Sequence, residues 1–317
     1  MSTTMSTPPP PSGTSAIDAA QEAIEHTRRH LFPFRFERWL VLGCVAFLDQ
    51  CGRRTGLGGV QVPGPGSWGN GGGSGDGEVP KALEWLAAHA FLVAGVAAAV
   101  LALVVALVAV ALWLNSRGVF MYVDNVATGR ADFERPWREH AARAGSYFSW
   151  SFGLALATIG GALVLVVAGG AAVAMLVSGP PGSGLTAGLG LAGVVVLLLA
   201  LFLASSVASL ALRDFVAPLQ IEGNLACGAA VRVLTALVRA HPGAFLVYLL
   251  LKIVYGLMAA FVLLVSACLT CCCVLLPVVT QTALQPLFYF ERAWPLFLLR
   301  QLGHDIVAKT GPTGPPS

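Results

Sequence analysis

Four cysteines near the C-terminal end are the residues with the most evident capacity for chemistry. Cys268, Cys271, Cys272 and Cys273 lie in the sequence SACLTCCC. The C-x-x-C spacing of Cys268 and Cys271 can hold zinc or form a redox-active pair. Cysteine is also a small apolar residue that packs well between helices. No histidine and no second C-x-x-C stands nearby, so packing, a disulfide and a metal site are three alternatives for this cluster.

Lys252 is the only charged residue in the apolar stretch 242–290. A charge inside a membrane helix is a functional candidate by default. Tyr248 and Tyr255 stand four residues before and three residues after Lys252, so the three side chains share a helix face. In one interpretation this stripe binds a lipid phosphate or an anionic substrate. In the other, Lys252 lies close to the cytoplasmic end of its helix and extends its ammonium group to the membrane surface.

A second polar cluster comprises Arg117, Asp124 and Asn125, and we include it among the candidate ligand-binding residues. Paired carboxylates can perform acid–base chemistry. Here each acid stands close to an arginine at a helix end, so an ion pair at the membrane interface is the simpler interpretation. The sequence contains no HExxH, GxSxG or phosphate-binding glycine motif. We therefore expect no catalytic residues, no cofactor and no enzymatic activity.

The composition is that of a membrane protein. Apolar residues make up 56% of the 317 residues and charged residues only 11%, whereas soluble domains average about 45–50% and about 25%. A water-soluble fold could not bury this much apolar surface, which argues against a soluble enzyme. The formal net charge of +3 is too small to indicate a nucleic-acid partner.

Long apolar runs predict the helices that carry these residues. A spanning helix needs about 20 apolar residues, and the runs at 85–116, 144–212 and 242–290 accommodate one, two and two helices. A sixth, shorter helix is expected at 34–49, before a Gly-rich external loop at 52–80. We predict an all-α polytopic membrane bundle of about six transmembrane helices in three pairs. The five long helices are expected at 83–115, 147–178, 185–214, 243–267 and 271–301, the last one kinked by Pro277 and Pro286.

Amphipathic segments precede and separate the helix pairs. Residues 15–32 form the first, in which Ser15 and Asp18 have the spacing of a helix-capping box. Its expected apolar face comprises Ile17, Ala20, Ile24 and Leu31. Two others are expected near 133–143 and 225–239, and the apolar stripe of the latter comprises Leu225, Ala229, Val233 and Leu237. Such helices lie in the membrane interface or pack against the cytoplasmic end of the bundle.

The distribution of arginine predicts the orientation. Cytoplasmic segments carry an excess of Lys and Arg, and placing both termini in the cytoplasm assigns most arginines to that side. We expect residues 15–305 to form one integral membrane domain of the bacterial inner membrane, between disordered tails at 1–14 and 306–317.

A weak internal repeat supports the three helix pairs. Aromatic clusters at 32–39, 147–150 and 245–248 each precede a pair, and an acid follows each exit: Asp124, Glu222 and Glu291. Small residues at four-residue spacing, such as Gly153, Ala157 and Gly161, predict close packing of the helices within a pair.

Several short motifs carry a resemblance. SRGVFMYVDN at 116–125 is followed by RPW at 135–137, and VAPL, CLTCCC, LLP and FERAW occur later at 216–219, 268–273, 275–277 and 290–294. This signature resembles that of an uncharacterised bacterial family of multi-pass inner-membrane proteins. More distantly, the paired helices look like the membrane domain that accompanies some glycerophosphodiester phosphodiesterases. The resemblance implies a helical bundle in an envelope or lipid context. It implies no catalytic residues, because the hydrolase domain is absent here.

Together these features predict a non-enzymatic membrane protein that organises lipid or partner proteins. Membrane lipids and other membrane proteins are the expected partners, and nucleic acid is not. The alternative is a small transporter or channel for an anionic or lipid-like substrate, built around Lys252 and the proline-kinked last helix.

Overall fold

The computed structural model describes residues 15–55, 88–180, 184–269 and 278–307. The N-terminal tail, residues 308–317 of the predicted C-terminal tail, most of the Gly-rich loop, Pro277 and Cys271–Cys273 lie outside these ranges. Ile306, which we placed at the start of the C-terminal tail, is buried in the core. The described residues form helices and contain no strand. The principal helices are α1 (Ala16–Leu31), α2 (Phe36–Thr55), α4 (Ala90–Thr128), α5 (Glu134–Glu139), α6 (Ala141–Ser178), α7 (Gly184–Ala211), α8 (Ala217–Gly223), α9 (Cys227–Ala240), α10 (Pro242–Leu269), α11 (Val279–Ala283) and α12 (Gln285–Gln301).

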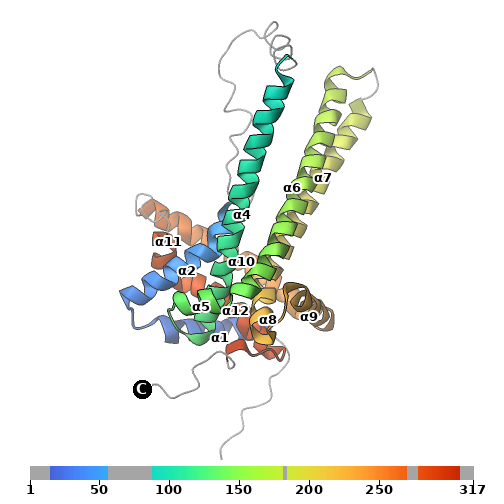
Figure 1. Cartoon of the computed structure of the whole chain (residues 1–317). Coiled ribbons are helices and arrows are strands. Elements are labelled where there is room, and N and C mark those ends of the chain that lie inside the picture. The colour runs from blue at the N-terminus through green and yellow to red at the C-terminus, as the bar shows by residue number, and fades with distance from the viewer. Residues whose placement is uncertain (1–14, 56–87, 181–183, 270–277, 308–317) are drawn as a thin grey trace, which may run out of the picture.

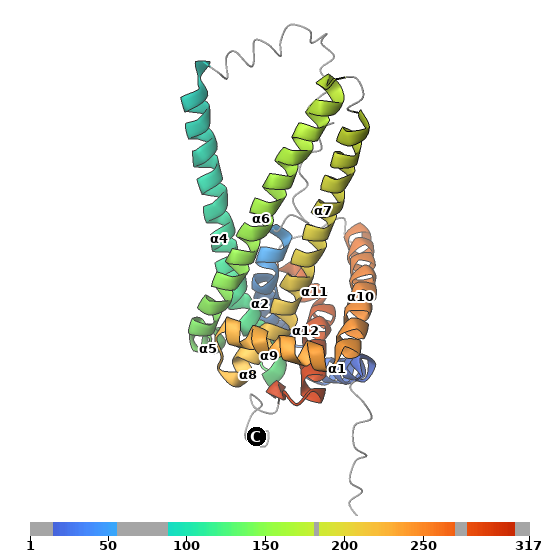
Figure 2. The same cartoon turned by 90° about the vertical axis from the view of Figure 1, so that its right-hand side faces the viewer.

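The molecule has a packed base and diverging apolar arms (Figure 1). Helices α1, α5, α8, α9 and α12 gather at the base, while α4 and the adjacent pair α6 and α7 rise from it and separate from each other. Figure 2 shows the same separation from the side and shows α10 rising apart from the other arms. The buried apolar core belongs to the base. Large apolar side chains of the arms are exposed, for example Leu107, Leu203 and Leu257.

Four helices of the described residues are long and apolar enough to cross a membrane: 94–128, 141–177, 184–223 and 242–266. The all-α membrane bundle is therefore supported, but the predicted count of six crossings is not reached. Helix α2 carries Asp49 and Gln50 in its interior. The last predicted helix is interrupted at Leu284, between α11 and α12. Polar residues and this break leave both segments outside the set of spanning helices.

Two of the long helices extend further into the base than the sequence indicates. Helix α4 runs on to Thr128 and ends at Gly129, whose φ of 64° suits glycine. Helix α7 continues through a π-helical turn, η2 (Leu212–Val216), into α8. The apolar pattern predicts only the membrane part of each helix, because the continuations contain polar residues.

Helix α1 buries only part of the face that we predicted, because Leu31 is buried in the core but Ile17 and Ile24 are not. The Ser15 cap is confirmed, because the Ser15 hydroxyl oxygen accepts a hydrogen bond from the Asp18 amide at 3.3 Å. The reciprocal half of the capping box is not formed, because the Ser15 amide donates to the Gln301 side chain at 2.9 Å instead. Its small residues Ala16, Ala19 and Ala23 are buried, whereas Ile17 and Ile24 are 53% and 57% exposed. Small side chains let the helix approach α12 closely, and the bulky isoleucines remain on the outer surface.

Helix α9 differs from the prediction in the same way. Cys227, Ala230 and Leu234 are its fully buried residues. Leu225, Val233 and Leu237 of the predicted stripe are partly buried and pack against the core. Helix α5 begins at Glu134, so Pro136 lies in its first turn. Periodicity identifies these helices correctly but shifts the face that packs.

Glycines allow α2 to pack against two other helices at once. A Cβ atom at Gly118 of α4 would overlap the backbone of Leu48 and Asp49. A Cβ atom at Gly43 of α2 would overlap the side chain of Thr282 in α11. By contrast, a Cβ atom at Gly153 would meet nothing within 4 Å. The closest helix contact therefore lies in the base rather than between α6 and α7.

Replacing Gly118 should separate α2 from α4. We expect Gly118→Val to destabilise the protein by about 1–3 kcal/mol, the usual cost of overpacking. The control is Gly95→Val in the same helix, where nothing lies within 4 Å of the added Cβ. Thermal unfolding in detergent measures both variants, and equal melting temperatures would contradict this account of the contact.

Candidate functional site

A network of buried charges lies where the arms enter the base. Asp49 of α2 is fully buried and forms ion pairs with Arg213 of η2 and with Arg292 of α12. The Arg213 guanidinium lies 2.5 Å from one Asp49 carboxylate oxygen, and Arg292 contacts the other. Two cations from different helices therefore share one carboxylate, and Arg213 also reaches the oxygen that Arg292 contacts, at 3.4 Å.

The network continues to the spanning helix α10. The ammonium group of Lys252 lies 2.9 Å from an Asp214 carboxylate oxygen and 3.4 Å from Glu291. Tyr248 donates a 2.8 Å hydrogen bond to the same Asp214 oxygen. Arg213 also reaches Glu291 at 2.9 Å. Lys252 is 7% exposed, so its ammonium group points into the base rather than out to the membrane surface.

The π-helical turn η2 brings the network together. It places both Arg213 and Asp214 in the interior, and the Arg213 carbonyl oxygen accepts a 2.8 Å hydrogen bond from Arg292. Turns of this kind often accompany functional positions in helices. Within the described residues, the carboxylates Asp49, Asp214 and Glu291 match the cations Arg213, Lys252 and Arg292. This balance of charge offsets the free-energy cost of burying the ions.

The other candidate residues lie in separate places. Tyr255 donates a hydrogen bond to the Leu287 carbonyl and so joins α10 to α12. Arg117 lies over the rings of Trp113 and Trp137 at 5.6 and 5.2 Å and donates to the Trp137 carbonyl. These contacts do not bring either residue into the charge network.

Asp124 and Asn125 fix the loop that follows α4. Asp124 forms ion pairs with Arg135 and, at 3.3 Å, with His140. Asn125 exchanges two hydrogen bonds with the backbone of Asp132. The sequence groups these residues with Arg117, but the structure gives them local partners on the segment 130–140.

The repeat acids have different surroundings. Asp124 and Glu222 lie outside the charge network, and Glu222 contacts His304 at 2.7 Å. Only Glu291 belongs to the network. The sequence alone does not connect Lys252 with its partners in the network, although each of them interrupts or borders an apolar run: Asp49, Arg213, Asp214 and Arg292. A charged residue that interrupts or borders an apolar run is the sequence signal that could have identified these residues.

The cysteine cluster is only partly described. Cys268 is an exposed free thiol, and its predicted partner Cys271 lies outside the described residues. Over the described ranges, no group of three or more His, Cys, Asp or Glu side chains is placed to hold a metal ion.

Two histidines lie where α1 meets α4 and α12. His26 lies 2.8 Å from the Val126 carbonyl oxygen and stacks on Tyr289. His30 packs beside His26 and against Gly129. Burial lowers the pKa of His26, and burial with neighbouring cations lowers the pKa of His30 to about 4. Both imidazoles are therefore neutral at pH 7.

Comparison with known proteins identifies a family whose function is unknown. Residues 14–303 match a family described only as a family of unknown function, DUF7544. The chain belongs to this family. The match covers nearly the whole sequence, so the base and the arms are both parts of the family domain. No curated protein and no solved structure matches the chain.

Removing Arg292 should leave Asp49 undercompensated in the interior. We expect Arg292→Met to destabilise the protein by about 3–5 kcal/mol, as for other broken buried pairs. Arg300→Met is the control, because Arg300 pairs with Glu22 at a half-exposed position and should cost less than about 1 kcal/mol. Thermal unfolding should also show partial recovery in Asp49→Asn/Arg292→Met. A double variant less stable than Arg292→Met would contradict the pairing.

Acid should weaken the attachment of α1. The folded state lowers the pKa of His26 and His30 below the ordinary value of 6.5, so between about 6.5 and 4 the unfolded chain binds more protons. Stability should be full above this window and fall as the pH drops through it. Thermal unfolding at several pH values should show a shallower loss in His26→Gln/His30→Gln. The exposed His241→Gln is the control, and an unchanged slope in the double variant would contradict this origin.

Proposed function

We propose that this chain is a non-enzymatic integral protein of the bacterial inner membrane that organises lipid or partner proteins around its arms. Both termini lie in the cytoplasm in this proposal, and α2 and α11–α12 complete three helix pairs. The supporting observation is the divergence of the arms above a packed base (Figure 2). Apolar faces that do not contact each other must be covered by lipid or by other helices.

The chemistry of the arms supports this proposal. The exposed residues of α4, α6, α7 and α10 are mainly Leu, Val and Phe. Lipid chains solvate such side chains as well as protein does, so these faces need no polar partner. In contrast, the charges of the base already pair with one another. A catalytic site would require titratable groups that face a substrate cavity.

Photo-crosslinking in the native membrane tests this proposal. A photoreactive side chain at Leu107 of α4 or Leu203 of α7, which are 61% and 65% exposed, should form adducts with lipid or with a membrane protein. The same probe at Arg138 of α5, whose side chain is 77% exposed at the base, should not form lipid adducts. Mass spectrometry identifies the adducts. Arms that crosslink only to water, with no lipid or protein adduct, would contradict the proposal.

A transporter or channel is the second candidate, and one observation favours it. The break at Leu284 lies between Gln281 and Gln285, which are buried. Gln281 donates to Gln50 and Gln285 donates to Tyr122, but their side-chain oxygens have no hydrogen-bond partner among the described residues. Interrupted helices with polar side chains line substrate paths in transporters.

Accessibility distinguishes the two candidates. In a transporter, Gln281→Cys should react with a membrane-impermeant maleimide applied to one side of a proteoliposome, because water would reach the break. In the scaffold, it should remain unlabelled. The chain has seven native cysteines, including the exposed Cys268, which can also react with maleimide. Each reaction is therefore compared with that of the unsubstituted chain.

A further inference from the structure

An apolar slot lies between α1 and the first turns of α12. It has a volume of about 340 Å³, and its wall includes Ile24 and Phe32 from α1 and Leu287 and Phe290 from α12. Tyr255 of the spanning helix α10 donates to the Leu287 carbonyl, so the slot lies beside a membrane arm. Its wall is almost entirely apolar, which suits a hydrocarbon chain rather than a polar metabolite.

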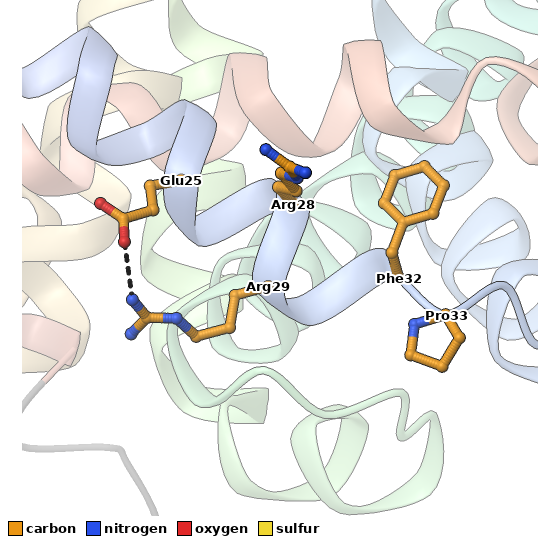
Figure 3. A pocket seen from close by; sticks show the side chains of 5 residues that line it. All are labelled: Glu25, Arg28, Arg29, Phe32 and Pro33. Atoms are coloured by element: carbon orange, nitrogen blue, oxygen red, sulfur yellow. Dashed lines mark hydrogen bonds and ion pairs between the residues drawn. The ribbon is translucent and has the colours of Figure 1, made fainter.

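Arg28 stands at the edge of this slot and also lines the adjoining open pocket. Figure 3 shows that Arg29 and Glu25 pair with each other, whereas Arg28 and Phe32 lie together on another side of the helix. The Glu25–Arg29 distance is 2.9 Å. No carboxylate of the described residues forms an ion pair with Arg28. Of these two arginines, Arg28 therefore has no ion pair among the described residues, and Arg28 is the one at the edge of the apolar slot.

The outer face of α1 has the character of a membrane-interface helix. Ile17, Ile24 and Arg28 recur at intervals of seven and four residues and so lie along one stripe. Phe32 is 53% exposed at the end of the same helix. Exposed large apolar side chains with arginine are typical of helices that lie in the headgroup region. A helix lying in the headgroup region with this stripe toward the membrane would hold Arg28 near the lipid phosphates.

We propose that the slot between α1 and α12 binds one anionic phospholipid, with an acyl chain against Ile24, Leu287 and Phe290 and the phosphate at Arg28. This assignment deepens the lipid-organising function proposed above and rests on it. The apolar wall accounts for the chain, and the unpaired guanidinium accounts for the preference for negative charge. Glu25 at the open side is neutralised by Arg29, so it does not oppose the phosphate.

Lipid titration followed by native mass spectrometry tests the site. The full chain in detergent is titrated with dioleoylphosphatidylglycerol and with dioleoylphosphatidylcholine. One molecule of phosphatidylglycerol, the anionic lipid, should bind per chain and more tightly than phosphatidylcholine. Arg28→Gln should weaken phosphatidylglycerol binding by about fivefold, the contribution of one arginine at an anionic surface. The double variant Glu25→Gln/Arg29→Gln is the matched control and should bind within about twofold of the unsubstituted chain, because it removes both members of an exposed ion pair and leaves the local charge unchanged.

A second pair of variants tests the acyl-chain wall. Ile24→Trp should fill the slot and weaken binding of both lipids, whereas Ile17→Trp, on the same stripe but outside the slot, should not. Both positions are exposed, and melting temperatures verify that the variants fold. Glycerol 3-phosphate, which has the phosphate but no chain, should not bind measurably.

The outcomes separate this site from the general function. Equal lipid binding by Arg28→Gln and by Glu25→Gln/Arg29→Gln, or glycerol 3-phosphate binding as tight as phosphatidylglycerol, would overturn the site. If the arms still crosslink to lipid in that case, the proposed function survives and only the slot is wrong. Loss of lipid and protein adducts at Leu107 and Leu203 would overturn the function itself.

Discussion

The pairing of Asp49 with Arg213 and Arg292 is the interaction on which the base depends. Each ion is buried, and an uncompensated ion in a protein interior costs several kcal/mol. The partners come from α2, η2 and α12, and Lys252 adds α10 through Asp214 and Glu291. No one of these elements can leave without exposing charges of the others to an apolar environment. These ion pairs thereby hold α2 against the long apolar helices. Helix α2 is itself too polar to count among the helices that could cross a membrane.

This constraint also explains the unequal packing of the molecule. The base is fixed by ion pairs and by the close approach of α2 at Gly43 and Gly118, so it needs no further partner. Above the base α6 and α7 pack against each other, but α4 diverges from this pair, and many leucines and valines of the arms face outward (Figure 1). Helix α1 covers the base with its alanines and leaves Ile17, Ile24 and Arg28 on the surface. A rigid polar base and lipid-facing arms are consistent with a protein that arranges its surroundings rather than transforms a substrate.

The sequence predicts the helices better than it predicts their contacts. Apolar runs locate α4, α6, α7 and α10, because hydropathy depends only on composition. They miss the lower end of α4 and the charges of η2, because polar residues buried by pairing look like exposed ones. The apolar face of α1 is also misplaced, since periodicity cannot tell isoleucines that meet lipid from alanines that meet α12. Lys252 and Tyr248, which the spacing predicts on one helix face, both contact Asp214, but this partner is distant from them in sequence.

Hydrogen exchange in lipid nanodiscs tests the central claim most directly. If the buried charges hold the base together, amides of α2, η2 and α12 should exchange slowly in the unsubstituted chain. Arg292→Met should accelerate exchange in all three elements together, while the membrane part of α6 stays protected. Faster exchange confined to α12, or no change in α2 and η2, would contradict the account, because the network would then not couple these helices.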